Sequence, residues 1–279
     1  MERFVTIDGV RLGLDDDGAG DPLVCLHAIG HDARDFGGVR ARWRDRHRVI
    51  ALDWPGQGRS LHDDRPATAT RYAELLDGVL DALRVESCVV LGNSIGGAAA
   101  ITHAARHPER VRGLVLENPG GLAPVDDHLA RTALAGMARF FAAGARGAVW
   151  FRPAFAFYYR LVLQRRAARD ARARIVGRAY ELAPVLEQAW RGFAEPEADL
   201  RHLAPRIGCP VLFAWATRDQ FVTLTRSLPA IRTFPDATLV RFSAGHAAHL
   251  ETPAAFEAAL EEFLARLPRP LSASRTAAP

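Results

Sequence analysis

One short segment places a serine where it could act as a nucleophile. The sequence GNSIG at residues 92–96 lies between an apolar run at 88–91 and an alanine-rich stretch that follows it. This pattern predicts a strand, a sharp turn and a helix, with Ser94 at the tip of the turn. Glycine is needed on both sides because strand and helix come too close there for larger side chains. We therefore expect strained backbone dihedrals and an exposed hydroxyl at Ser94.

A serine hydroxyl is a weak nucleophile at neutral pH, so it needs a base and a third group that orients the base. Asp219 follows an apolar run at 210–215, and His246 follows another at 237–242. Both residues are expected at the carboxyl edge of a parallel sheet, where open α/β sheets bind their ligands. The order Ser94, Asp219, His246 is the one expected for a triad built on such a turn.

The acid and the pocket walls leave alternatives open. Glu117 ends the strand after the predicted serine-bearing helix and is the alternative acid, although we favour Asp219. His249 competes with His246, but we interpret it as a structural or pocket-wall residue. Asn93 lines the pocket or only stabilises the turn. The residues expected to line the substrate pocket are His27, Asn93, Arg152, Arg160, Phe221 and His249.

No metal site and no cofactor is predicted. His103 and His107 share one helix face at i, i+4 spacing, yet the sequence offers no evident third ligand. Asp53 precedes a turn rich in glycine and proline, and we expect it to hydrogen-bond backbone groups of that loop. The cysteines are interpreted as buried thiols, because each lies in or beside a predicted strand. They are Cys25, Cys88 and Cys209.

Composition indicates a globular α/β protein. The chain has 279 residues, 49% of them hydrophobic, enough to bury a large core in one elaborated domain. Its net charge of +4, from 36 arginines against 32 acidic residues, is too small to indicate nucleic-acid binding. No apolar run approaches the roughly 20 residues that a membrane span requires, and the start lacks a signal-peptide pattern. We expect a cytoplasmic protein that acts on a small molecule, with no nucleic-acid or membrane partner and with a homodimer left open.

Strand and helix signals alternate along most of the chain. Strands are expected at 3–8, 10–15, 23–27, 48–53, 88–91, 111–116, 210–215 and 237–242, and helices at about 32–44, 72–83, 95–106 and 253–267. This alternation predicts an α/β fold, with a mostly parallel, twisted sheet of about eight strands flanked by helices. The expected division is an α/β core at 1–120 and 206–267, an inserted helical cap at 121–205 and a disordered tail at 268–279.

These motifs together resemble the α/β-hydrolase fold enzymes over nearly the whole chain. The matching segments are LHAIG at 26–30, DWPGQGRS at 53–60, GNSIGG at 92–97, RD at 218–219, and GH at 245–246 through ETP at 251–253. GNSIGG, NPGGL at 118–122 and RDQFV at 218–222 are most similar to the meta-cleavage-product hydrolases, which cut a carbon–carbon bond in vinylogous diketo acids. The chain departs from them where HAIGHD at 27–32 replaces a glycine-rich segment, and where Ala247 replaces the tryptophan that typically follows the catalytic histidine.

The resemblance implies an oxyanion hole formed by the backbone amides of Ile29 and Ile95. Ala28 stands where the family usually has glycine, so a positive φ there would strain the loop. The expected function is that of a serine hydrolase, which acts through an acyl-enzyme on a small, largely apolar carbonyl substrate such as a carboxylic ester. The alternatives are a C–C bond hydrolase of vinylogous diketo acids and, in another class, a ligand receptor or binding protein on the same fold.

Overall fold

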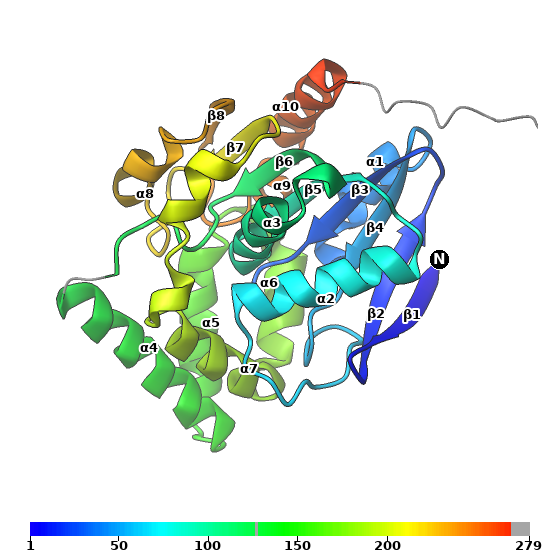
Figure 1. Ribbon diagram of the computed structural model, residues 1–279. Coiled ribbons are helices and arrows are strands. Elements are labelled where there is room, and N and C mark those ends of the chain that lie inside the picture. Colours follow the sequence, from blue (N-terminus) through cyan, green and yellow to red (C-terminus); the bar gives the residue numbers. More distant parts are fainter. Residues whose placement is uncertain (126–127, 269–279) are drawn as a thin grey trace, which may run out of the picture.

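A single twisted sheet forms the centre of the computed structural model, which describes residues 1–125 and 128–268 (Figure 1). The strands are β1 (Glu2–Ile7), β2 (Val10–Asp17), β3 (Asp21–Leu26), β4 (His47–Leu52), β5 (Cys88–Asn93), β6 (Val111–Glu117), β7 (Val211–Ala216) and β8 (Ala237–Phe242). Their order is β1-β2-β4-β3-β5-β6-β7-β8. β2 pairs antiparallel with β1 and β4, and the other neighbours pair in parallel. The predicted fold class is confirmed.

Helices cover both faces of this sheet. The helices of the core are α1 (Gly37–Trp43), α2 (Ala69–Ala82), α3 (Ile95–Arg106), α8 (Leu224–Ile231), α9 (Ala248–Glu251) and α10 (Pro253–Arg266). Short 3₁₀ helices are η1 (Ala33–Phe36), η2 (Pro108–Arg110), η3 (Arg166–Ala168), η4 (Pro196–Ala198) and η5 (Arg201–Arg206). The helix expected at 32–44 is split into η1 and α1, and the two meet at the consecutive glycines 37 and 38, which favour helix weakly.

The central strands are buried on both faces, as expected for parallel strands under two helical layers. Along β3, Val24 and Leu26 belong to the hydrophobic cluster that includes residues of α2 and α3. Leu23 and Cys25 point the other way, into a second cluster with residues of α1 and α10. This period of two explains the nearly continuous apolar run in the sequence. None of the three cysteines is in a disulfide; Cys25 and Cys88 are buried, and Cys209 is partly buried.

Between β6 and β7 the chain leaves the sheet and forms four longer helices, which Figure 1 shows gathered together in green below the sheet. They are α4 (His128–Ala145), α5 (Phe151–Val162), α6 (Arg169–Gly177) and α7 (Ala179–Gly192). Their aromatic rings pack mainly on one another; Phe141, for example, contacts Phe155 and Trp190. We refer to these helices as the cap.

Within the described residues, no helix combines the length and the apolar character needed to cross a membrane. The tail expected to be disordered, 268–279, lies outside the described residues except for its first position.

Candidate active site

Ser94 occupies a strained turn between β5 and α3. Its φ of 56° and ψ of −118° lie outside the regions that non-glycine residues ordinarily adopt. A Cβ atom on Gly92 would lie 2.6 Å from the carbonyl oxygen of Gly96, and one on Gly96 would lie 2.3 Å from that of Leu26. Only glycine fits this crossing. The Ser94 side chain makes no capping hydrogen bond to α3, so its hydroxyl is left for other chemistry.

Asp219 and His246 form a buried pair. The Nδ1 atom of His246 lies 2.6 Å from Oδ2 of Asp219, although the two residues come from different loops, after β7 and after β8. The other carboxylate oxygen accepts hydrogen bonds from the backbone amides of Phe221 (2.8 Å) and Val222 (3.1 Å). Burial alone would lower the pKa of His246, but the Asp219 carboxylate outweighs burial, and the pKa is raised above its ordinary value. The imidazole is therefore oriented, and its cation is stabilised.

Asn118, which the sequence analysis did not single out, holds Asp219 from a third direction. Its Nδ2 donates to Oδ2 of Asp219 (2.8 Å) and to the carbonyl oxygen of Ala216 (3.1 Å). Its Oδ1 accepts from the amide of Ala216 at 2.7 Å. Asn118 directly follows β6 and has a positive φ of 39°, a conformation that asparagine tolerates better than most residues. The sequence feature that could have indicated this role is an asparagine at the end of a strand, directly before Pro119.

Glu117, the alternative acid, is engaged elsewhere. Its Oε1 lies 2.8 Å from Nδ1 of His249, and its Oε2 accepts from the backbone amide of His249 at 3.1 Å. Burial would lower the pKa of His249, yet the Glu117 carboxylate raises it on balance. The His249 ring also stacks on Phe36, with ring centroids 4.7 Å apart. Glu117 therefore contacts His249 and forms no hydrogen bond or ion pair with His246.

The two residues whose amides are expected to form the oxyanion hole line the same cavity as the serine. Ile29 and Ile95 both line it, and neither backbone N–H donates to another described residue. The adjacent amide of Gly30 donates to Oε1 of Gln57 at 2.6 Å, which holds the loop. The positive φ of this loop falls on Gly30, at 80°, and Ala28 is outside the left-handed region. The alanine therefore introduces no strain of the kind considered from the sequence.

The cavity that joins these groups has a volume of about 650 Å³. Ser94 and His246 both line it and are only 8% and 7% exposed, so their side chains are reached through the cavity. Most of the wall is apolar or aromatic, and part of it comes from the cap. Lining residues include Ala28, Ile95, Ala98, Leu134, Tyr158, Tyr159, Val162, Trp190, Phe193, Phe221 and Val222. A strained serine, an oriented imidazole and two unpaired amides around one cavity can together support nucleophilic attack on a carbonyl group.

The two cap arginines expected in the pocket are not part of its wall. Arg152 and Arg160 are exposed, whereas Phe155, Tyr159 and Val162 of the same helix are buried. The helical period explains this, since α5 turns its aromatic face inward and its arginines outward. Within the described part of the chain, the arginine that lines the cavity is Arg191, which pairs with Glu187 at 2.6 Å.

Of the other expected pocket residues, Phe221 lines the cavity, and the remaining ones have structural contacts instead. Nε2 of His27 accepts from the amide of Trp54 at 3.0 Å. Asn93 donates to the backbone oxygens of Glu117 (3.1 Å) and His246 (2.9 Å), so it ties the serine turn to the histidine loop. His249, which pairs with Glu117, is also absent from the cavity wall.

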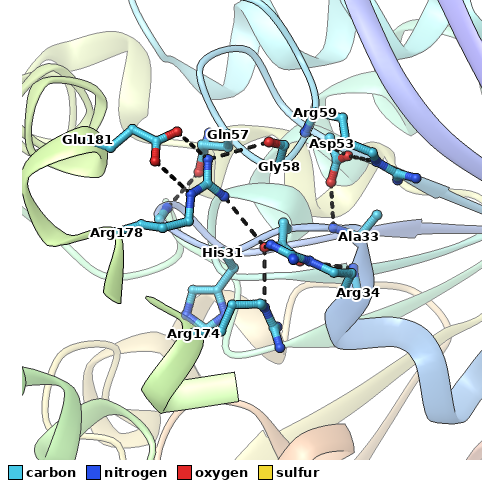
Figure 2. A network of polar contacts seen from close by, with 12 residues as sticks. His31, Ala33, Arg34, Asp53, Gln57, Gly58, Arg59, Arg174, Arg178 and Glu181 are labelled. Atoms are coloured by element: carbon cyan, nitrogen blue, oxygen red, sulfur yellow. Dashed lines mark hydrogen bonds and ion pairs between the residues drawn. The ribbon is translucent and has the colours of Figure 1, made fainter. Parts of the chain in front are cut away.

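Ion pairs and charged hydrogen bonds hold the loop that follows β4, and Figure 2 shows this network. As predicted, Asp53 accepts from backbone amides, those of Ala33 (2.7 Å) and Arg59 (3.1 Å). Two arginines of the cap reach the same region: Asp32 lies 3.4 Å from Nε of Arg174 and 3.7 Å from Nη1 of Arg178. These ion pairs connect α6 and the start of α7 to the loop that follows β3.

One group of side chains has the composition of a metal site. Asp77 of α2 offers the third ligand that was not evident from the sequence, and ligand atoms of Asp77, His103 and His107 lie within 4.8 Å of one another. Burial and neighbouring His107 lower the pKa of His103 to about 4. The carboxylate, however, already pairs with Nη1 of Arg110 at 2.8 Å, and this positive charge disfavours a cation.

Comparison with known proteins agrees with this geometry. The sequence profile of the alpha/beta hydrolase fold matches residues 21–253. The chain is 34% identical to the 2-hydroxymuconate semialdehyde hydrolase of Pseudomonas sp. (strain CF600), across 94% of this chain and 93% of that protein. It is 28% identical to the 2-hydroxy-6-oxo-6-phenylhexa-2,4-dienoate hydrolase of Burkholderia cepacia, across 94% and 96%. The chain belongs to the α/β-hydrolase fold family.

A solved structure extends the comparison of the fold. A thermophilic esterase from Thermogutta terrifontis superposes with a TM-score of 0.78 over 95% of this chain and 98% of that one, at 23% identity. On the family match and the curated relatives, the protein is an enzyme, a hydrolase of the α/β fold with sequence similarity to C–C bond hydrolases.

Proposed function

We propose that the enzyme is a serine hydrolase in which Ser94 attacks the carbonyl carbon of a small, mainly apolar substrate. Nε2 of His246 takes the hydroxyl proton, and Asp219 keeps Nδ1 protonated and stabilises the imidazolium. The amides of Ile29 and Ile95 stabilise the oxyanion. His246 then gives its proton to the leaving group, and water activated by the same nitrogen hydrolyses the acyl-enzyme. The observation that carries the proposal is the Asp219–His246 pair lining one cavity with the strained Ser94.

The cavity supports the substrate class. A volume of about 650 Å³ lies within the range of small-molecule sites, and an apolar wall favours an apolar substrate. Since Arg152 and Arg160 lie outside the wall, an anionic substrate group would depend on Arg191. A carboxylic ester needs no positively charged group in the cavity wall and is therefore our first candidate.

Carbon–carbon cleavage is the second candidate, and its support is the 34% identity to a 2-hydroxymuconate semialdehyde hydrolase over nearly both chains. The same serine, histidine and oxyanion donors would serve that reaction. In addition, the substrate must ketonise first, so that a carbanion-like group can leave.

Labelling with a fluorophosphonate tests the nucleophile. We expect the wild type to be labelled and Ser94→Ala to be unlabelled, with Ser227→Ala as the control because Ser227 is buried outside the cavity. Labelling that persists in Ser94→Ala would contradict the assignment. A hydrolysis panel of short aryl esters and vinylogous diketo acids then separates the two candidate reactions by their kcat/KM values.

A further inference from the structure

A second imidazole backed by a carboxylate lines the cavity, and the mechanism above does not use it. Nδ1 of His31 lies 2.5 Å from Oδ2 of Asp35, and both residues are buried. His31 lies two residues after Ile29, on the loop that supplies an oxyanion amide. It belongs to the cavity wall together with Ser94 and His246. The active-site cavity therefore holds two histidines, each with its own aspartate.

The position of Asp35 determines which ring nitrogen is left for a ligand. Because Nδ1 faces the carboxylate, Nε2 lies on the opposite side of the His31 ring, and it forms no hydrogen bond with any described residue. The only aromatic contact of His31 within the described chain is with Tyr159, at 5.7 Å between ring centroids. Tyr159 also lines the cavity.

Asp35 has a second partner, Arg174 of the cap, with which it forms an ion pair. Burial would raise the pKa of Asp35, but His31 and Arg174 outweigh burial and hold the pKa below its ordinary value. Figure 2 shows Arg174 reaching this loop beside His31. The ionised Asp35 accepts a hydrogen bond from the Nδ1–H group of His31, and in this tautomer of the neutral ring Nε2 carries the lone pair and is a hydrogen-bond acceptor.

An unpaired acceptor in a mostly apolar wall is costly unless a ligand satisfies it. We propose that His31 forms a polar subsite that accepts a hydrogen bond from a hydroxyl group of the substrate, beside the carbonyl attacked by Ser94. The substrate is then a hydroxylated carbonyl compound rather than a simple alkyl ester. This inference rests on the proposed function, because it names the substrate class of the same site.

Matched esters test the subsite. We would compare aryl esters that differ by one hydroxyl group, placed in either the acyl or the leaving part. His31→Phe removes Nε2 but keeps a planar ring against Tyr159, and it should lower kcat/KM for a hydroxylated ester about ten- to a hundredfold. The unhydroxylated partner should change by less than about threefold. His31→Gln, which keeps an acceptor, should retain part of the preference, and His47→Phe, outside the cavity, should leave it unchanged.

The outcomes separate the subsite from the proposed function. If His31→Phe loses kcat/KM equally on both esters, His31 has a structural role and the subsite is overturned. If it loses kcat/KM on neither ester, the subsite is also overturned. Both results leave the proposed function standing, provided that Ser94 is labelled and both esters are hydrolysed. If the wild type hydrolyses neither ester, calorimetry of their binding to Ser94→Ala, with and without His31→Gln, replaces the rates. The absence of a preference for the hydroxylated ester in that measurement would overturn the inference. Thermal denaturation checks that each variant is folded.

Discussion

Replacing Asp219 with asparagine tests the orientation of the catalytic base. The carboxylate accepts from four donors: two backbone amides at Oδ1, and Nδ2 of Asn118 and Nδ1 of His246 at Oδ2. An asparagine side chain at this position must turn its NH₂ group toward one of these two pairs of donors. The backbone amides cannot become acceptors, whereas His246 can, by moving its proton from Nδ1 to Nε2.

This change of tautomer points an N–H group at Ser94 where a lone pair is needed. Asp219→Asn should therefore reduce kcat by a factor on the order of 10⁴ while the protein stays folded, as for the corresponding change in a serine protease triad. Pre-steady-state hydrolysis of an activated aryl ester gives the acylation rate directly.

Glu117→Gln is the matched control, because it disturbs the other buried carboxylate–imidazole pair. We expect it to reduce kcat less than tenfold, since Glu117 contacts His249 and not His246. A loss below tenfold in Asp219→Asn, together with a large loss in Glu117→Gln, would refute this reasoning and assign the orienting role to Glu117.

Three further outcomes are expected. Because the pKa of His246 is raised above 6.5 and catalysis needs the neutral ring, kcat/KM should fall with decreasing pH from an apparent pKa above that value; a pH profile with its midpoint below 6 would contradict this. Asn118→Ala removes the hydrogen bonds that Asn118 makes with Asp219 and with the backbone of Ala216, so kcat should fall about ten- to a hundredfold and stability by about 3 kcal/mol, measured by ester hydrolysis and urea unfolding. Arg152→Ala and Arg160→Ala should each leave kcat/KM within about twofold, since both side chains lie outside the cavity wall; a tenfold rise in KM would show that they reach the substrate.

The fold was largely predictable because its signals are local. The glycines of GNSIG and the period of the following residues predicted the helix at 95–106, which is α3. Apolar runs gave the parallel strands, since a strand buried on both faces leaves a continuous pattern. The helix expected at 32–44 was less accurate, because two consecutive glycines divide it.

Details of the site depend on contacts that no local pattern encodes. The sequence could not tell which face of α5 meets the cavity, so Arg152 and Arg160 were expected on the wrong side. It also could not bring Asp77 of one helix beside His103 and His107 of another. No local pattern indicated the role of Asn118, because its link to Asp219 spans 101 residues of the sequence.

The ion pairs that Arg174 and Arg178 make with Asp32 have a consequence for turnover. Asp32 lies three residues beyond Ile29, so the cap is fastened to the same short loop that supplies an oxyanion donor. A displacement of α6 would therefore be transmitted to that loop through these ion pairs. The placement of the cap and the geometry of the oxyanion donor are thus linked, although Arg174 and Asp32 are 142 residues apart in the sequence.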